Sequence, residues 1–327
     1  MTSITEIRRE SIRTMHEQVT GGTVEEFAVD LLSITIPTLS CWVKNNIGRE
    51  STDRIVAGRD KAEDIEIKID GLSEKFIVKV INNKLAKKHG LSFSVLSEHN
   101  NSEVINEGKP HALIVLDPFE NSDEYKRRLP TPPFSHFQIY NHGHEPIAAG
   151  AGNLTTGEMY FSAHGNNYCF SPESKFKKLV VIPKPREVKS VKDGNVAIAS
   201  YDGKYKYSSL FDEYFTELKK DLEKSGGSFH GKGGSHSYID LTNGAISAYI
   251  MFNEPRGETD PAYLFALQAG CRIVSVDLET GEYKDYKFDP SLQHKRTPFL
   301  IAARSTELIE EIIRYYMQVR NSRSQTI

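Results

Sequence analysis

"LIVLDPFENSDEY", residues 113–125, joins an apolar run to a turn that carries four acidic residues. The apolar run has the length and composition of a buried strand. Pro118 fixes the backbone direction directly after it. Carboxylates gathered in such a turn have two interpretations: they bind a hard cation such as Mg²⁺, or the dipole of a following helix favours them there.

The order of residues within the turn makes a cation site chemically reasonable. Asp117 ends the apolar run, and Glu120 follows three residues later. Pro118 allows the carbonyl of Phe119 to point toward the same place, so that two carboxylates and a carbonyl surround one point. Ser122 then begins a predicted helix, whose free backbone N–H groups suit a phosphate.

The composition narrows the class of protein. The chain has 327 residues, 38% hydrophobic and 26% charged, which is typical of a soluble globular protein with one large domain or two medium ones. A net charge of −3 gives no reason to expect binding to nucleic acid or to an anionic membrane. The polar N-terminus lacks the apolar core of a signal peptide, and no long apolar run predicts a membrane span. The chain has three cysteines and no CxxC motif, a pattern that predicts reduced thiols in a cytoplasmic protein.

Hydrophobic periodicity organises the first half of the chain. Apolar residues at helical spacing predict a helix over 23–43, which Pro37 is expected to kink. Residues 63–70, "EDIEIKID", alternate charge and isoleucine like a strand with one buried face, or the end of one. Residues 72–90 have a helical period, and residues 110–170 read as an antiparallel meander with Gly and Asn turns.

The segment "PKPRE", residues 183–187, is the expected boundary between two halves, 1–182 and 183–327. The second half alternates predicted helices and strands, which indicates an α+β or α/β sandwich. Its expected elements are a helix over 208–224, a glycine-rich loop, helices over 238–250 and 260–270, strands at "RIVSVDL" and "FLIAA", and a terminal helix from Ser305.

Two further acidic residues stand at the ends of predicted elements. Glu98 ends the short apolar run "SVLSEH", and Asp260 stands directly before Pro261 at the start of an apolar helix. Asp at the N-cap with Pro at the next position is a preferred helix start. A carboxylate that caps a helix can also bind a metal, so both interpretations of Asp260 stay open.

The loop "GGSFHGKGG", residues 226–234, contains the G-x-x-x-x-G-K spacing of a phosphate-binding P-loop. However, Gly233 stands where a Ser or Thr would bind Mg²⁺, and a helix rather than a strand is expected before the loop. We therefore interpret the segment as a flexible loop.

The order of these segments resembles the inositol monophosphatase family of Mg²⁺-dependent, lithium-sensitive sugar-phosphate phosphatases. That family carries D-x-x-T-x-x-D, a G-E-E-type acid, D-P-[IL]-D-G-[ST] and W-D-x-A-A. The corresponding segments here are "DIEIKID" (64–70), "LSEH" (96–99), "DPFENS" (117–122) and "TDPAY…QAGC" (259–271). The resemblance extends from about residue 23 to about residue 320.

The resemblance implies a five-layered α-β-α-β-α sandwich, with a large antiparallel sheet in the first half and a smaller sheet in the second. It implies two or three Mg²⁺ ions bound by Glu98, Asp117, the carbonyl of Phe119, Glu120 and Asp260. It also implies that Asp70 and the Ser122 hydroxyl orient the attacking water, and that the backbone amides of Asn121 and Ser122 hold the phosphate.

Several positions depart from the family pattern. Glu120 replaces the second Asp of the central motif, and Asn121 replaces its Gly, although Asn tolerates positive φ better than most residues. Ile67 stands where the first motif has Thr, and Thr259 where the last motif has Trp. Asn253 falls where some members have an acid that contacts inositol, which leaves the substrate open.

The expected function is a cytoplasmic, metal-dependent phosphomonoesterase that acts on a small phosphorylated polyol, sugar or nucleotide. Family members are often dimers, so the resemblance implies a homodimer. The alternative is a catalytically silent relative that binds a phosphorylated ligand or a partner protein, as Glu120, Asn121 and Ile67 suggest. Each predicted carboxylate ligand that changed is still a carboxylate, which favours the enzyme.

Overall fold

The computed structural model describes residues 22–46, 55–59, 64–97, 103–106, 111–127, 131–171, 179–202, 213–292 and 295–324. The chain divides into two compact units, the first made of Met1–Ile182 and Asp260–Leu264 and the second of Pro183–Thr259 and Phe265–Ile327. The division after Ile182 coincides with the boundary expected from the sequence. The segment Asp260–Leu264 differs from that expectation, because it packs with the first half.

The first unit is built on an eight-stranded sheet of order β10-β9-β8-β7-β6-β5-β3-β4. Its strands are β3 (Ser92–Ser97), β4 (Glu103–Ile105), β5 (His111–Glu120), β6 (Phe134–Tyr140), β7 (Pro146–Asn153), β8 (Met159–Ala163), β9 (Asn166–Phe170) and β10 (Leu179–Ile182). Strands β5 to β9 pair antiparallel in sequence order, which confirms the predicted meander. Strand β3 pairs antiparallel with β4 on one side and parallel with β5 on the other. The sheet is therefore mixed.

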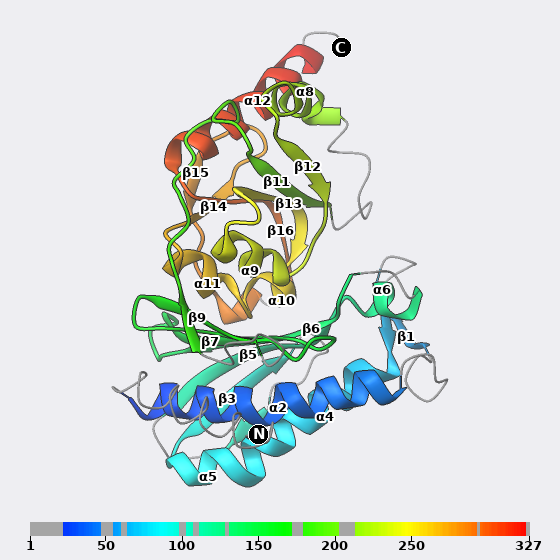
Figure 1. The fold of residues 1–327 in the computed structure, drawn as a ribbon, viewed down its shortest axis with the longest axis vertical. Helices are drawn as coiled ribbons and strands as arrows, with labels where there is room; N and C mark the ends of the chain where they lie inside the picture. Colours follow the sequence, from blue (N-terminus) through cyan, green and yellow to red (C-terminus); the bar gives the residue numbers. More distant parts are fainter. Residues whose placement is uncertain are drawn as a thin grey trace, which may run out of the picture. The chain divides into compact units, whose positions relative to one another are not determined.

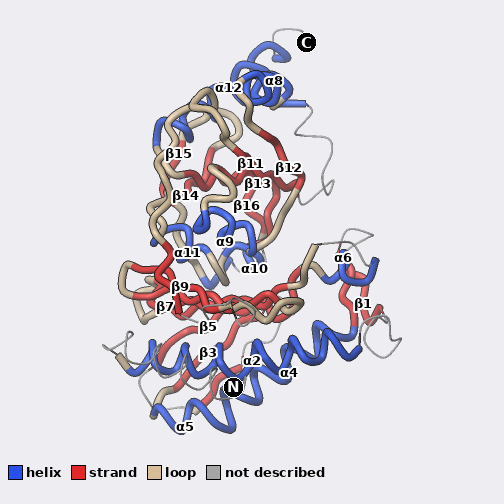
Figure 2. Tube along the Cα trace, in the orientation of Figure 1, coloured by secondary structure: helices blue, strands red, loops and turns tan. Residues whose placement is uncertain are grey.

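Helices cover one face of this sheet (Figures 1 and 2). They are α2 (Thr23–Asn46), α4 (Lys68–Val80), the π-helix η1 (Ile81–Leu85) and α5 (Ala86–His89). Their apolar side chains share one core with alternate residues of the strands, such as Ile114, Phe137 and Ile139. The predicted helices over 23–43 and 72–90 are confirmed. Helix α4, however, begins at Lys68, directly after the short strand β2 (Asp64–Ile67), which pairs with β1 (Ile55–Arg59).

Helix α2 lies close to strand β7 because that strand is made of small residues. A Cβ atom added at Gly152 would lie 2.4 Å from Cγ2 of Ile36 in α2. A Cβ at Gly150 would lie 2.3 Å from Cζ of Phe137 in the neighbouring strand. The two glycines therefore make space for a helix side chain and for a ring.

The sequence analysis expected no run that is apolar enough to cross a membrane. By length and composition, however, the helical segment Thr23–Asn45 is long and apolar enough to do so. Of that window, 61% is buried inside the structure. Phe27, Leu31 and Ile36 of this helix belong to the core of the first unit. Their packing against the sheet accounts for the apolar composition.

The second unit is built on a six-stranded sheet of order β12-β11-β13-β16-β14-β15. Its strands are β11 (Ala197–Asp202), β12 (Ser228–Gly231), β13 (Ala248–Pro255), β14 (Arg272–Val276), β15 (Tyr283–Asp285) and β16 (Arg296–Ala303). Strand β11 pairs parallel with β12 and β13, whereas β13, β16, β14 and β15 pair antiparallel. This sheet is also mixed.

Helices α8 (Thr216–Lys224) and α12 (Thr306–Ser324) pack on one face of that sheet around Phe215, Ile250 and Phe299 (Figure 1). The N–H of Leu308 donates to Ser305 Oγ at 3.0 Å, so the terminal helix is capped where the sequence predicts its start. Further described helices of the second half are α9 (His236–Asn243), α10 (Arg256–Thr259), α11 (Tyr263–Gln268) and the 3₁₀-helix η2 (Pro290–Leu292).

Three sequence predictions in the second half need correction. The apolar segment 238–250 is not one helix: α9 ends at Asn243, Gly244 follows with φ of 77°, and β13 begins at Ala248. The glycine-rich loop contains the strand β12, which pairs with β11. The helix expected over 208–224 is interrupted at Phe215, whose backbone is not helical, so α8 begins at Thr216. Residues 208–212 of that prediction lie outside the described residues.

Candidate functional site

A β-bulge in β5 brings Asp117 and Glu120 to the same face of the first sheet. Asp117 pairs with His136 of β6, and Glu120 pairs with Phe134, so three steps along β5 match two steps along β6. Without the extra residue, Glu120 would face away from Asp117. Pro118, which has no N–H to donate, lies within the irregular stretch. Phe119 packs into the core beside Tyr125, with ring centroids 5.3 Å apart.

Strand β6 adds polar side chains to the same face. Phe137 and Ile139 point into the helix-covered core, so His136, Gln138 and Tyr140 lie on the opposite face by strand alternation. All three are buried, with exposed fractions of 1% or less. Sequence analysis did not single them out, although the alternation of polar and apolar residues from His136 to Ile139 is the signal that could have found them.

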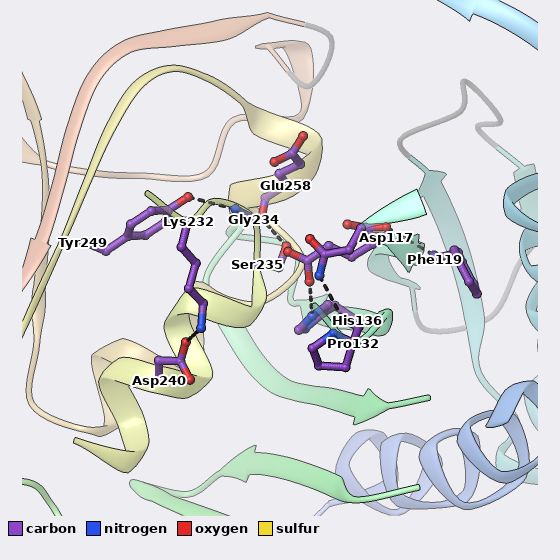
Figure 3. Close-up of polar contacts among 12 residues, drawn as sticks. Asp117, Phe119, Pro132, His136, Lys232, Gly234, Ser235, Asp240, Tyr249 and Glu258 are labelled. Atoms are coloured by element: carbon purple, nitrogen blue, oxygen red, sulfur yellow. Dashed lines mark hydrogen bonds and ion pairs between the residues drawn. The ribbon is translucent and has the colours of Figure 1, made fainter. Parts of the chain in front are cut away.

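Glu120 is in contact with His136. The Nε2 atom of His136 lies 2.7 Å from Oε2 of Glu120, and the two side chains are 0% and 4% exposed. The imidazole stacks on Phe134, with ring centroids 5.5 Å apart and an interplanar angle of 17°. Nearby, the N–H of Phe119 donates to Oδ1 of Asp117 at 3.3 Å (Figure 3).

Hydrogen bonds attach the segment Asp260–Leu264 to this face. The hydroxyl of Tyr140 donates to the carbonyl of Asp260 at 2.5 Å. The side chain of Gln138 accepts from the N–H of Leu264 at 2.8 Å and donates to the Tyr140 hydroxyl at 2.5 Å. Asp260 is 0% exposed and lies in the turn between α10 and α11, so the predicted N-cap role is wrong: α11 begins only at Tyr263.

Tyr140→Phe should reveal how strongly this attachment stabilises the fold. We expect the free energy of unfolding to fall by about 1–3 kcal/mol, because a buried carbonyl and a buried amide each lose a hydrogen bond. Urea unfolding followed by circular dichroism measures the change. Tyr316→Phe is the control, since that hydroxyl donates to the carbonyl of Leu278 at 3.2 Å in a partly buried place and should matter less. Equal losses in the two variants would contradict the attachment.

Helix α4 contributes two further buried carboxylates. Asp70 and Glu74 stand four residues apart, so they lie on one face of α4, and they are 1% and 3% exposed. The hydroxyl of Ser97, the last residue of β3, donates to Oε2 of Glu74 at 2.9 Å. Glu74 was missed by the sequence analysis, although its spacing from Asp70 is visible there. Glu98, the next residue after β3, lies outside the described residues, so its predicted role stays a prediction.

The residues after Glu120 have the backbone that the sequence suggests. Asn121 has φ of 64°, the left-handed region that Asn tolerates, and its side chain donates to the carbonyl of Pro132 at 3.0 Å. Ser122 begins α6 (Ser122–Arg127), a helix of six residues. The predicted phosphate contacts of Asn121 and Ser122, like the predicted water contacts of Asp70 and Ser122, stay predictions.

The expected Mg²⁺ ions fit these residues only in part. Among the residues that the structure describes, no three His, Cys, Asp or Glu side chains come together closely enough to hold a metal ion. Asp117, Glu120 and Asp260 therefore do not form such a group by themselves. Asp117 and Asp260 suit a cation, because they are buried carboxylates at 1% and 0% exposure in the same unit. Glu120 suits it less, because His136 already contacts its carboxylate.

The glycine-rich loop of the second unit is no phosphate cradle. As the sequence predicts, a helix comes before it: α8 ends at Lys224, strand β12 lies within the loop, and α9 follows it. The N–H of Lys232 donates to the Ser200 carbonyl at 2.8 Å, and the N–H of Gly234 donates to the Tyr249 hydroxyl at 2.9 Å. The Lys232 ammonium pairs with Asp240 (Figure 3). The groups that would bind phosphate in a P-loop are therefore used within the unit.

Tyr249 can donate a hydrogen bond while it accepts the one from Gly234, because its hydroxyl stays protonated. Burial, followed by the nearby charge of Glu254, raises the pKa of Tyr249 well above its usual value. The hydroxyl donates to Oε1 of Glu254 at 3.1 Å while it accepts from Gly234. This chain of bonds fixes the loop before α9 in one conformation.

The fold matches solved structures of inositol monophosphatases. An inositol monophosphatase II from Staphylococcus aureus MSSA476 matches with a TM-score of 0.62 at 15% identity, covering 93% of this chain and 97% of that one. The IMPase of Thermotoga maritima matches with a TM-score of 0.60 at 13% identity, covering 90% and 99%. An IMPase/NADP phosphatase complexed with Mg²⁺ and phosphate matches with a TM-score of 0.59 at 14% identity, covering 86% and 91%. No protein-family model matches the sequence, and no curated protein matches it significantly.

The protein thus has an inositol monophosphatase-like fold, with two mixed sheets and flanking helices, as the sequence resemblance implies. At identities of 13–15% the likeness establishes the fold alone. The activity must be argued from the residues of this chain.

Proposed function

We propose that the protein is a metal-dependent phosphomonoesterase that hydrolyses a small phosphorylated polyol, sugar or nucleotide. The observation that carries the proposal is the attachment of Asp260 to the face of the sheet that bears Asp117. Two buried carboxylates from distant parts of the sequence thereby belong to one unit. The fold supports the same reaction class, because the matching structures include phosphatases.

In this proposal Asp117 and Asp260 bind a divalent cation, together with Glu98, which the sequence predicts as a ligand. Mg²⁺ is the proposed ion, since oxygen ligands suit it and a structure of the same fold is complexed with Mg²⁺ and phosphate. Such an ion supplies an activated water and stabilises the leaving oxygen. Asp70 and the Ser122 hydroxyl orient the attacking water, and the N–H groups of Asn121 and Ser122 hold the phosphate. A homodimer in the cytoplasm is part of the same proposal.

Hydrolysis of a substrate panel tests the proposed function. The panel contains inositol phosphates, fructose bisphosphate, other sugar phosphates, nucleotide 3′-phosphates and p-nitrophenyl phosphate. Phosphate release is measured with Mg²⁺ and, separately, after chelation with EDTA. We expect Mg²⁺-dependent turnover of at least one small phosphate ester. Release that is equal with and without the metal, or no release from any member, would contradict the proposal.

The second candidate is a protein that binds a phosphorylated ligand without hydrolysing it. The contact between His136 and Glu120 favours it, because one of the carboxylates expected to bind metal has another partner. Calorimetry with the same panel separates the two functions. Micromolar binding without turnover would support the silent relative.

A further inference from the structure

Glu120 differs from the other predicted metal ligands in having an imidazole directly against its carboxylate. The separation of 2.7 Å between Nε2 of His136 and Oε2 of Glu120 is that of a strong charge-assisted hydrogen bond. An ionised carboxylate can only accept, so Nε2 of His136 is the donor toward an ionised Glu120. The pair is part of the buried structure, because the two side chains are 0% and 4% exposed.

Three features of the fold hold the pair together. The bulge in β5 turns Glu120 to the face that carries His136. The imidazole is stacked on Phe134, two residues earlier on the same face of β6. Strands β5 and β6 are paired on both sides of the bulge, at Asp117 and at Glu120.

The extra methylene of glutamate explains why this position is not aspartate. Glutamate extends about 1.5 Å further than aspartate from the same backbone. With the backbone at its present place, an aspartate carboxylate would fall short of the 2.7 Å contact with His136. The presence of Glu instead of the family's Asp at position 120 is therefore explained by the contact with His136 in β6. It does not require a shift of the backbone to make room for the longer side chain at a metal.

A buried carboxylate needs a cation or hydrogen-bond donors. We propose that His136 takes the place of a metal ion at Glu120, so that any divalent cation on this face is bound without Glu120. The inference rests on the proposed function for Asp117 and Asp260, but it concerns a different residue pair. It also agrees with the described residues, among which Asp117, Glu120 and Asp260 do not form one metal-holding group.

Titration calorimetry with Mg²⁺ and, separately, Mn²⁺ tests this inference on the full chain. Glu120→Gln should keep the wild-type affinity and stoichiometry within twofold, since Gln can still accept from His136. Asp117→Asn should weaken binding at least 30-fold. His136→Ala should strengthen binding at least tenfold or add one equivalent of metal, because it releases the Glu120 carboxylate. Circular dichroism and unfolding midpoints show which variants are folded.

His89 provides a matched control in the same unit. Its Nε2 atom lies 2.7 Å from Oδ2 of Asp30, and its side chain is 5% exposed, so it repeats the imidazole–carboxylate contact away from the acidic turn. His89→Ala should leave metal affinity unchanged. A gain of metal binding in His89→Ala equal to that in His136→Ala would overturn the inference, because it would not depend on Glu120.

The remaining outcomes also decide the question. If Glu120→Gln weakens metal binding as much as Asp117→Asn does, the inference is overturned. This comparison does not need His136→Ala, so it can be made even if that variant does not fold. If the wild type binds no metal, a gain in His136→Ala supports the inference, and no gain in any folded variant overturns it. Hydrolysis of the substrate panel is measured independently of metal binding. A protein without phosphatase activity can therefore still show that His136 takes the place of a metal ion at the Glu120 carboxylate.

Discussion

Asp117→Asn is expected to lower kcat/KM for phosphate-ester hydrolysis by about three orders of magnitude. A metal ion at a phosphoryl centre contributes several kcal/mol to transition-state stabilisation, and about 1.4 kcal/mol corresponds to a tenfold change in rate. Asn has nearly the same shape as Asp, but it lacks the charge that holds the cation. Its Oδ1 atom can still accept the Phe119 N–H, which Asp117 accepts at 3.3 Å, so the fold should be retained.

The measurement is kcat/KM with the most active substrate of the panel, at saturating Mg²⁺ and at several lower concentrations. Asp30→Asn is the matched control, because Asp30 is a largely buried carboxylate of the first unit that pairs with Lys88 and His89. We expect that control to keep activity within about twofold. Retention of more than a tenth of wild-type activity by Asp117→Asn would remove Asp117 from the proposed mechanism.

Gly152→Ala is expected to lower the free energy of unfolding by about 3 kcal/mol, at the upper end of the usual range for overpacking. The new Cβ would lie 2.4–2.5 Å from three side-chain atoms of Ile36, which is 0% exposed on α2. Because Ile is branched at Cβ and fixed in a helix, it has little freedom to move aside. Either α2 shifts from β7 or Ile36 leaves its rotamer.

Urea unfolding of four proteins measures this clash: the wild type, Gly152→Ala, Ile36→Ala and the double variant. The double variant should lose less stability than the sum of the single losses, because the methyl group occupies space vacated by Ile36. Gly143→Ala is the control for replacing a glycine as such, since its Cβ would contact only the side-chain oxygen of Asn141, at 3.2 Å. Strict additivity of the two losses would contradict the close packing of α2 on β7.

Long periodic segments were predictable from the sequence because their signals repeat over many residues. The apolar spacing over 23–43 and 72–90 follows the helical period, and both segments are helical in the structure. The meander over 110–170 combines short apolar runs with Gly and Asn turns, which fold locally into antiparallel pairs. The order of the acidic motifs also predicted the fold that the solved structures share.

Short apolar runs were not predictable in the same way. Residues 238–250 contain the end of α9 and the start of β13, because a buried strand and a buried helix segment have similar composition. Strand β12 lies in a glycine-rich segment, and its pairing with β11 depends on residues far away in the sequence. For Asp260 the local helix-start signal was overridden by the attachment of the turn to Tyr140.

By itself, the sequence determined the acidic turn, its strand and the fold class, since each depends on local composition or on the order of motifs. Only the tertiary structure decided what Glu120 contacts. Its partner His136 lies on another strand, β6. The contact depends on one extra residue in β5, because this bulge moves the later side chains of that strand to the opposite face of the sheet. A strand register is set by packing across the whole sheet, and no local pattern within residues 113–125 contains that information.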